Sequence, residues 1–217
     1  MKIYRYILLF IFLTPFLLFN NQCAKTKDVE LINNTNDTTT NNTDTVYYGF
    51  VLNEVLYDPP SGSAGDANGD GVRDPNDDEF VEFVNDSDST INLSGYKIYD
   101  ATRLAAGTPN HEFPENTFLN PGQAVVVFGG GSPVGNFGGA LVFTASNQVL
   151  NLNNAGDMMT MTDSTGNMVL EFDVEPLSDN PNESYTRDPD LSGDFVQHNG
   201  VSGTLFSPGT KTDGTSF

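Results

Sequence analysis

The sequence predicts an all-β fold in which two sheets pack against each other as a sandwich. Short apolar runs alternate with clusters of Gly, Pro, Asn and Asp along most of the chain, a pattern typical of short strands joined by turns. Apolar residues do not recur at helical spacing over ten or more residues, so long amphipathic helices are not expected. Residues 46–217 have the size of one ordinary domain, and their many Phe and Tyr residues can supply its core.

Strands are expected at residues 50–57, 79–85, 91–99 with a turn inside, 124–128 and 168–174. The apolar run 124–128 is uninterrupted, which predicts burial on both faces of its sheet. Residues 168–174 alternate between apolar and other side chains with a period of two, as a strand with one covered face does. Hairpin-type turns are expected at residues 154–157 and 163–166. Turns at such intervals favour seven or more short strands in two sheets.

Residues 1–22 are interpreted as a signal peptide. Lys2 and Arg5 precede the apolar run 7–19, which is too short to cross a bilayer as a helix. Cys23 is the only cysteine and follows this run closely, in a placement that resembles a bacterial lipoprotein signal in which the cysteine is lipidated. The alternative is a secreted protein with a free thiol. With one cysteine, no disulfide forms within the chain.

Residues 23–45 are rich in Asn, Thr and Asp. They have little to bury, so we expect a disordered tether between the anchor and the domain. The whole chain carries a net charge of −20 and only nine Lys and Arg residues. Nucleic-acid binding and a polybasic membrane patch both require clustered positive charge, so neither is expected. Membrane contact is expected through the lipid anchor only.

Residues 66–77 have the spacing of a calcium-binding loop. Oxygen-bearing side chains occupy loop positions 1, 3, 5, 9 and 12, and Gly71 occupies position 6. The predicted Ca²⁺ ligands are Asp66, Asn68, Asp70, the backbone carbonyl of Val72, Asp74, Asp77 and Asp78. Mg²⁺ is less expected, because it keeps its waters and avoids cages made only of protein. The alternative is a solvated acidic loop without an ion.

A few other residues could carry chemistry. Glu54 and Glu82 lie on strands that are expected to be neighbours, and two carboxylates can support acid–base catalysis. We expect them instead to accept hydrogen bonds at the rim of a sheet. His111 and His198 have no partners at metal-ligand spacing and are expected at the surface. The segment Gly129–Gly135 lacks the residues of a phosphate-binding loop and is expected to be a flexible connection.

Six segments, taken together, resemble the lamin tail domain family. They are residues 52–59, 78–85, 91–100, 119–128, 152–157 and 186–195. Tyr96 stands where the family commonly has Trp, and it keeps a large aromatic side chain there. The resemblance spans most of residues 50–211 and implies an immunoglobulin-like β-sandwich of the lamin-tail type. It also implies a non-catalytic module that binds or tethers, which is an analogy from fold to function.

These observations together predict an exported, calcium-stapled binding or adhesion module that is not an enzyme. The expected location is a bacterial cell envelope, as an outer-membrane lipoprotein or at the cell surface, with secretion as the alternative. The expected partner is a protein or glycan at the cell surface. Two alternatives stay open: a structural envelope protein that associates with itself, and a calcium-dependent hydrolase. An enzyme would need His, Lys or Arg side chains converging beside its carboxylates.

Overall fold

The computed structural model describes residues 49–179 and 181–217. The predicted signal peptide, Cys23 and the tether at residues 23–45 lie outside these ranges. Within the described residues, no helix has the length and apolar character needed to cross a membrane.

The larger of the two main sheets has six strands and contains both the first and the last strand of the described fold. Its order is β12 (Asp194–Gln197), β11 (Tyr185–Asp188), β1 (Phe50–Leu56), β2 (Phe80–Asn85), β7 (Ala124–Phe128) and β8 (Leu141–Thr144). Neighbouring strands are antiparallel, except that β8 runs parallel to β7. The strands β1, β2 and β7 therefore occupy central positions.

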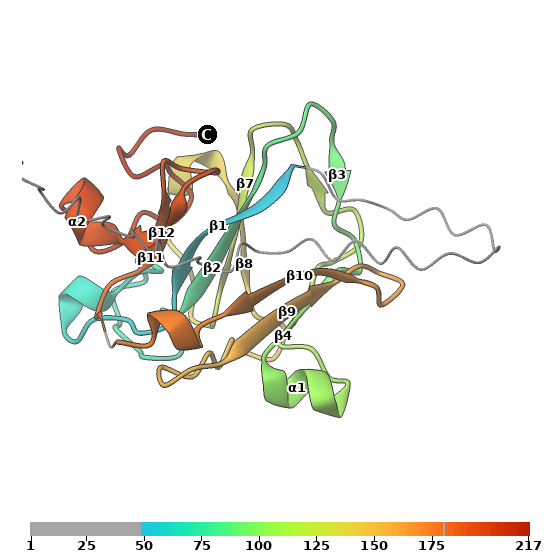
Figure 1. Cartoon of the computed structure of the whole chain (residues 1–217), viewed down its shortest axis with the longest axis horizontal. Helices are drawn as coiled ribbons and strands as arrows, with labels where there is room; N and C mark the ends of the chain where they lie inside the picture. The colour runs from blue at the N-terminus through green and yellow to red at the C-terminus, as the bar shows by residue number, and fades with distance from the viewer. Residues whose placement is uncertain (1–48, 180) are drawn as a thin grey trace, which may run out of the picture.

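The second main sheet packs across the first, as Figure 1 shows. Its order is β10 (Met168–Asp173), β9 (Met158–Thr162), β4 (Lys97–Tyr99) and β5 (His111–Glu112). A small separate sheet pairs β3 (Ile91–Asn92) with β6 (Phe118–Leu119). The α-helices of the described part are short, α1 (Ala101–Ala106) and α2 (His198–Ser202). The fold is the predicted all-β, immunoglobulin-like β-sandwich.

The five expected strands are present, with one change in arrangement. Residues 91–99 divide between β3 and β4, which belong to different sheets. The predicted turn at residues 163–166 joins β9 and β10 as a hairpin, whereas the turn at residues 154–157 only leads into β9. The strands β5, β6, β8, β9, β11 and β12 were not expected, because their short segments lack a clear period of two.

Apolar side chains form two separate cores. The inner core lies between the sheets and includes Val55, Tyr57, Val81, Phe83, Val125, Val127, Met159, Met161 and Tyr96. The outer core lies on the opposite face of the six-stranded sheet and consists of Leu56, Ala67, Phe80, Val126 and Phe128, covered in part by Phe137, Ala140, Val142 and Phe206. Successive residues of β7 alternate between the two cores, which explains why this strand is apolar throughout and confirms its predicted burial on both faces.

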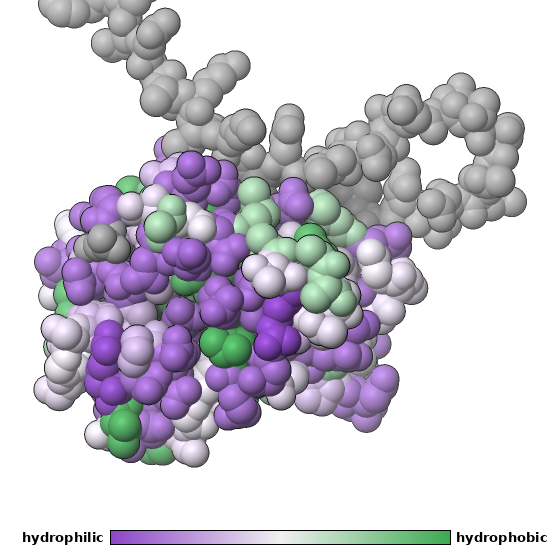
Figure 2. Space-filling view, turned by 90° about the horizontal axis from the view of Figure 1, so that it is seen from below, coloured by the Kyte–Doolittle hydropathy of each residue, from purple (hydrophilic) through white to green (hydrophobic). Residues whose placement is uncertain are grey.

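The surface is mainly polar. The face shown in Figure 2 is largely hydrophilic, and its apolar residues are broken into small separate areas. This agrees with the composition of the chain, in which 29 Asp and Glu residues stand against nine Lys and Arg.

Candidate functional site

The acidic loop, residues 66–78, lies in the long connection between β1 and β2. Its side-chain oxygens accept hydrogen bonds from backbone N–H groups a few residues later. Asp66 Oδ2 accepts from Gly71 N at 2.9 Å, and Asn68 Oδ1 accepts from Asp70 N at 3.0 Å. Asp70 Oδ1 accepts from Val72 N at 2.9 Å. The loop therefore winds around the oxygens at positions 1, 3 and 5.

Asp78 fastens this loop to the start of β2. It is fully buried, and its Oδ1 accepts hydrogen bonds from Ala67 N at 2.8 Å and Asn68 N at 3.1 Å. Its Oδ2 accepts from Asp74 N at 2.8 Å. Burial raises the pKa of Asp78, and these three N–H donors oppose that rise. Both oxygens of Asp78 are thus occupied in holding the loop in shape.

Two observations show that the loop concentrates uncompensated negative charge. The Oδ1 atom of Asp66 is buried and has no hydrogen-bond partner. Burial raises the pKa of Asp77, and repulsion from Asp74, Asp78 and Asp70 raises it further. Among the residues that the structure describes, no three His, Cys, Asp or Glu side chains converge on one point at metal-binding distance. A cation here would therefore draw on the Asn68 amide and on backbone carbonyls besides carboxylates, a mixed oxygen set that Ca²⁺ accepts.

The remaining predicted ligands lie on the same loop with different exposure. Asp66, Asp70, Asp74 and Asp77 are half-buried, and Asn68 is fully buried. The side chain of Val72 is 66% exposed. The spacing of oxygen-bearing residues in the sequence therefore identified a single loop whose side chains lie close to one another.

The glycine-rich segment 129–135 packs directly on the acidic loop. Ser132 N donates to Asp70 Oδ2 at 3.1 Å, and Val134 N donates to Asn68 O at 2.8 Å. A Cβ atom added to Gly131 would lie 2.4 Å from Asn68 Nδ2 and 2.7 Å from Asp70 Oδ2. The segment is a loop, as expected, but it is fastened to its neighbour, because its backbone N–H groups bind the acidic loop and its glycines allow that close approach.

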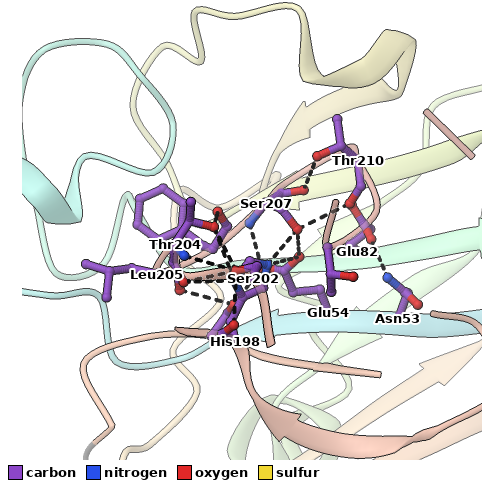
Figure 3. Close-up of polar contacts among 12 residues, drawn as sticks. Asn53, Glu54, Glu82, His198, Ser202, Thr204, Leu205, Ser207 and Thr210 are labelled. Atoms are coloured by element: carbon purple, nitrogen blue, oxygen red, sulfur yellow. Dashed lines mark hydrogen bonds and ion pairs between the residues drawn. The ribbon is translucent and has the colours of Figure 1, made fainter. Parts of the chain in front are cut away.

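A second polar cluster lies on the outer face of the six-stranded sheet. Glu54 of β1 and Glu82 of β2 are Cα partners in the sheet, and both are fully buried. Figure 3 shows the two carboxylates meeting groups from the C-terminal part of the chain. The prediction that these residues lie at a rim was wrong, whereas their role as hydrogen-bond acceptors is confirmed.

Glu54 receives hydrogen bonds from residues that are distant in sequence. Its Oε1 accepts from Ser184 Oγ at 2.5 Å and from Ser207 N at 2.9 Å, and its Oε2 accepts from Ser207 Oγ at 2.8 Å. Nε2 of His198 lies 3.9 Å from Oε2. Burial raises the pKa of Glu54, while the His198 charge and the three hydrogen bonds pull it down. Glu54 is therefore the better-compensated carboxylate of the pair.

Glu82 has fewer compensating contacts. Its Oε1 accepts from Asn53 Nδ2 at 3.0 Å, and its Oε2 accepts from Gly209 N at 2.6 Å. Burial raises the pKa of Glu82 well above its ordinary value, and the neighbouring Glu54 charge raises it further. Two carboxylates held this close share protons more readily than they ionise together. Of the two carboxylates, Glu82 therefore has the stronger tendency to keep a proton.

His198 is fully buried, so its predicted surface position was wrong. Its Nδ1 lies 2.9 Å from Thr204 O and 2.7 Å from Ser202 Oγ. Its Nε2 lies 2.7 Å from Ser207 Oγ, which itself donates to Glu54. Ser207 thus links the ring of His198 to the carboxylate of Glu54 by a chain of polar contacts.

These three residue types also occur in hydrolases, but their arrangement here differs. In a catalytic triad the carboxylate orients the imidazole nitrogen that does not face the serine. Here Glu54 and Ser207 both lie on the Nε2 side of His198. Glu54 and His198 are also fully buried, so substrate has no access to them. The cluster is built to hold the chain together.

His111 is buried as well, against the prediction of a surface position. Its ring packs edge-on against Phe113 with centroids 4.6 Å apart, and it also contacts Phe143. Its Nε2 is buried without a hydrogen-bond partner. Burial lowers the pKa of His111 to about 4. Its position in β5 and its aromatic neighbours make it a core residue.

Comparison with known proteins yields one family match. The model described as Lamin Tail Domain matches residues 43–175. No curated protein matches the chain. The match includes the acidic loop, Glu54 and Glu82, and it stops before the C-terminal residues that cover the two glutamates.

Proposed function

Since the chain belongs to the lamin tail domain family, we propose that it is a non-enzymatic binding module whose β1–β2 connection is ordered by Ca²⁺. The family is a structural immunoglobulin-like domain family whose members are not typically enzymes. The observation that carries the proposal is the acidic loop, with its buried, unpartnered Asp66 Oδ1 atom and its mutually repelling carboxylates. A divalent cation relieves both features at once.

The ion acts as a staple in this proposal. Asp66, Asn68, Asp70, Asp74 and Asp77, with the Val72 carbonyl, would hold it, and Asp78 would keep the loop in register. Extracellular modules bind Ca²⁺ with dissociation constants of about 10⁻⁴–10⁻³ M. At roughly 1 mM free Ca²⁺ this stabilises the fold by only about 0.4–1.4 kcal/mol. A stabilisation of this size is enough to order a loop, but it is too small to drive a sharp signalling switch.

The module works at the outside of a bacterial cell in this proposal. Lipidated Cys23 anchors it in the envelope, residues 23–45 act as the tether, and the domain meets a protein or glycan at the cell surface. The position of Cys23 after an apolar run and the Asn- and Thr-rich composition of the tether support this arrangement. The acidic surface favours a partner with complementary positive charge.

Calcium binding is tested by calorimetry and thermal unfolding of the mature chain. We expect measurable heat on addition of Ca²⁺ and an increase in Tm of a few °C at about 1 mM. Mg²⁺ at the same concentration should give much less. Asp66→Asn together with Asp70→Asn should remove the calcium response, whereas Asp88→Asn, at an exposed site outside the loop, should keep it. Absence of heat and of any Tm change would exclude the staple.

Location and partner class need separate measurements. Mass analysis of the mature N-terminus shows whether Cys23 carries lipid, and protease treatment of intact cells shows whether the domain is exposed. Binding of the purified chain to intact cells, compared with and without chelator, tests the adhesion proposal. A molecular size that rises with protein concentration would favour the self-associating structural alternative instead.

A further inference from the structure

The C-terminal residues 203–217, called the strap below, cover the outer face of the six-stranded sheet. Phe206 packs against the outer core. The backbone N–H groups of Ser207 and Gly209 donate to Glu54 and Glu82 respectively. Thr212 Oγ1 donates to Asp190 Oδ2 at 3.0 Å, and Ser216 Oγ donates to Gly138 O at 2.8 Å. The strap is therefore held at five residues along its length.

The central contacts of the strap are made to buried ionisable groups. Glu54 and Glu82 both carry no exposed surface while the strap is in place. Ser207 and Gly209 supply the N–H groups that reach them, so the closed strap seals both carboxylates from water. If both were ionised beneath it, two like charges would lie side by side without solvent, which is costly. An open strap would let water hydrate each of them.

The charged and titratable surroundings of the pair come from several elements. Glu54 lies on β1 and Glu82 on β2, while His198 comes from α2 and faces Glu54. Asp190 lies in the connection between β11 and β12. Its Oδ1 accepts a hydrogen bond from Asn53 Nδ2 at 3.4 Å, and the same Nδ2 donates to Glu82. Three carboxyl groups are thus gathered near one imidazole, whose ion-pair partner is Glu54.

We infer that the strap is a proton-controlled cover, closed while Glu54 and Glu82 share a proton and released from the sheet when that proton leaves. The raised pKa of Glu82 means that the closed form binds more protons than the open form above the ordinary pKa of glutamate. Closure is therefore strongest at low pH and is lost as pH rises through the closed-state pKa. Release uncovers Leu56, Phe80 and the two glutamates on one face.

Because Gly209 fits closely against its neighbours, a substitution there can loosen the strap without changing either glutamate. Gly209 has a φ of +83°, and a Cβ atom added there would lie 2.1 Å from Phe137 O. Gly209→Ala should therefore loosen the strap at every pH without removing either glutamate. Glu82→Gln should do the reverse, because a neutral amide keeps the acceptor oxygen for Gly209 N and cannot ionise.

The test is hydrogen exchange of the Ser207 and Gly209 amides in the mature chain between pH 5.5 and 9, expressed as protection factors. For one proton, protection should fall about tenfold per pH unit until Glu82 is ionised in the closed form as well. Amides of β7 report global unfolding and should keep their protection. Glu82→Gln should abolish the pH dependence of protection. Gly209→Ala should lower protection at every pH but retain its pH dependence. Glu115→Gln, at an exposed site, should match wild type.

Infrared spectroscopy gives an independent readout on the unaltered chain. The carbonyl band of a protonated carboxylic acid should persist at neutral pH and disappear over the pH range in which the strap amides lose protection. Strap protection that does not change with pH would overturn the inference. So would a parallel loss in β7, or a Glu82→Gln variant with the wild-type pH profile.

Discussion

The backbone N–H of Ser207 donates to Oε1 of Glu54 at 2.9 Å, although 153 residues separate them in sequence. This contact joins a strand inside the family match to a C-terminal segment outside it. Burying the Glu54 carboxylate without hydrogen bonds would cost free energy, and the C-terminal segment supplies the donors that offset this cost. Burial of Glu54 depends on those donors, and so does the attachment of the strap.

Replacing Glu54 with Ala should be strongly destabilising. The change leaves the Ser207 amide, the Ser184 hydroxyl and the buried His198 without their partner, so we expect a loss of about 3–5 kcal/mol. Urea denaturation at pH 7 measures it. Glu115→Ala, at an exposed position, is the control and should change stability by less than about 0.5 kcal/mol. Similar values for both variants would contradict the assigned network.

Acid should weaken the fold through His111. Its pKa is about 4 in the folded protein, against an ordinary value of 6.5. As pH falls, His111 is therefore protonated in the unfolded chain before it is protonated in the folded one. The free energy of unfolding should decrease by about 3 kcal/mol in all between about pH 6.5 and about pH 4. His111→Phe suits the neighbouring Phe113 and Phe143 and should remove this component. The check is the difference in unfolding free energy between the two proteins, which should change with pH.

Gly131→Ala should damage the acidic loop more than the fold. The new methyl group would collide with Asn68 and Asp70, and the φ of +70° adds strain. We expect loss of the calcium-dependent rise in Tm. Gly139→Ala is a matched control, because Gly139 has a φ of +87° but nothing within 4 Å of its Cβ position. An undiminished calcium response in Gly131→Ala would separate the glycine-rich segment from the site.

Arg187→Lys should weaken the edge of the larger sheet. Arg187 Nε donates to Leu52 O at 2.8 Å, and Nη1 donates to Gly193 O at 2.7 Å. Its guanidinium also lies 4.5 Å from the ring centroid of Phe195. Lys cannot reproduce this planar set of contacts, so we expect a loss of about 1–3 kcal/mol in urea unfolding. Unchanged stability would mean that β12 is held by its backbone pairing alone.

Much of the fold could be read from local patterns. The uninterrupted run 124–128 predicted a strand buried on both faces, and that is how β7 lies between the two cores. The spacing of oxygens in residues 66–77 likewise identified a loop that winds around its own side chains. These features depend on neighbouring residues, so spacing and composition are sufficient to predict them.

The outer polar cluster could not be predicted in this way. Glu54, Glu82 and His198 looked like rim or surface residues, because the segment that covers the two glutamates is distant from them in sequence. Apart from Asn53, the donors to the two glutamates come from residues 184–209, which reach them only after β11 adds to the sheet and the chain folds back. The sequence by itself determined the longer central strands, the two-sheet architecture and the position of the acidic loop. Tertiary structure alone decided which charged groups are buried, since burial depends on what covers a residue and not on its own identity.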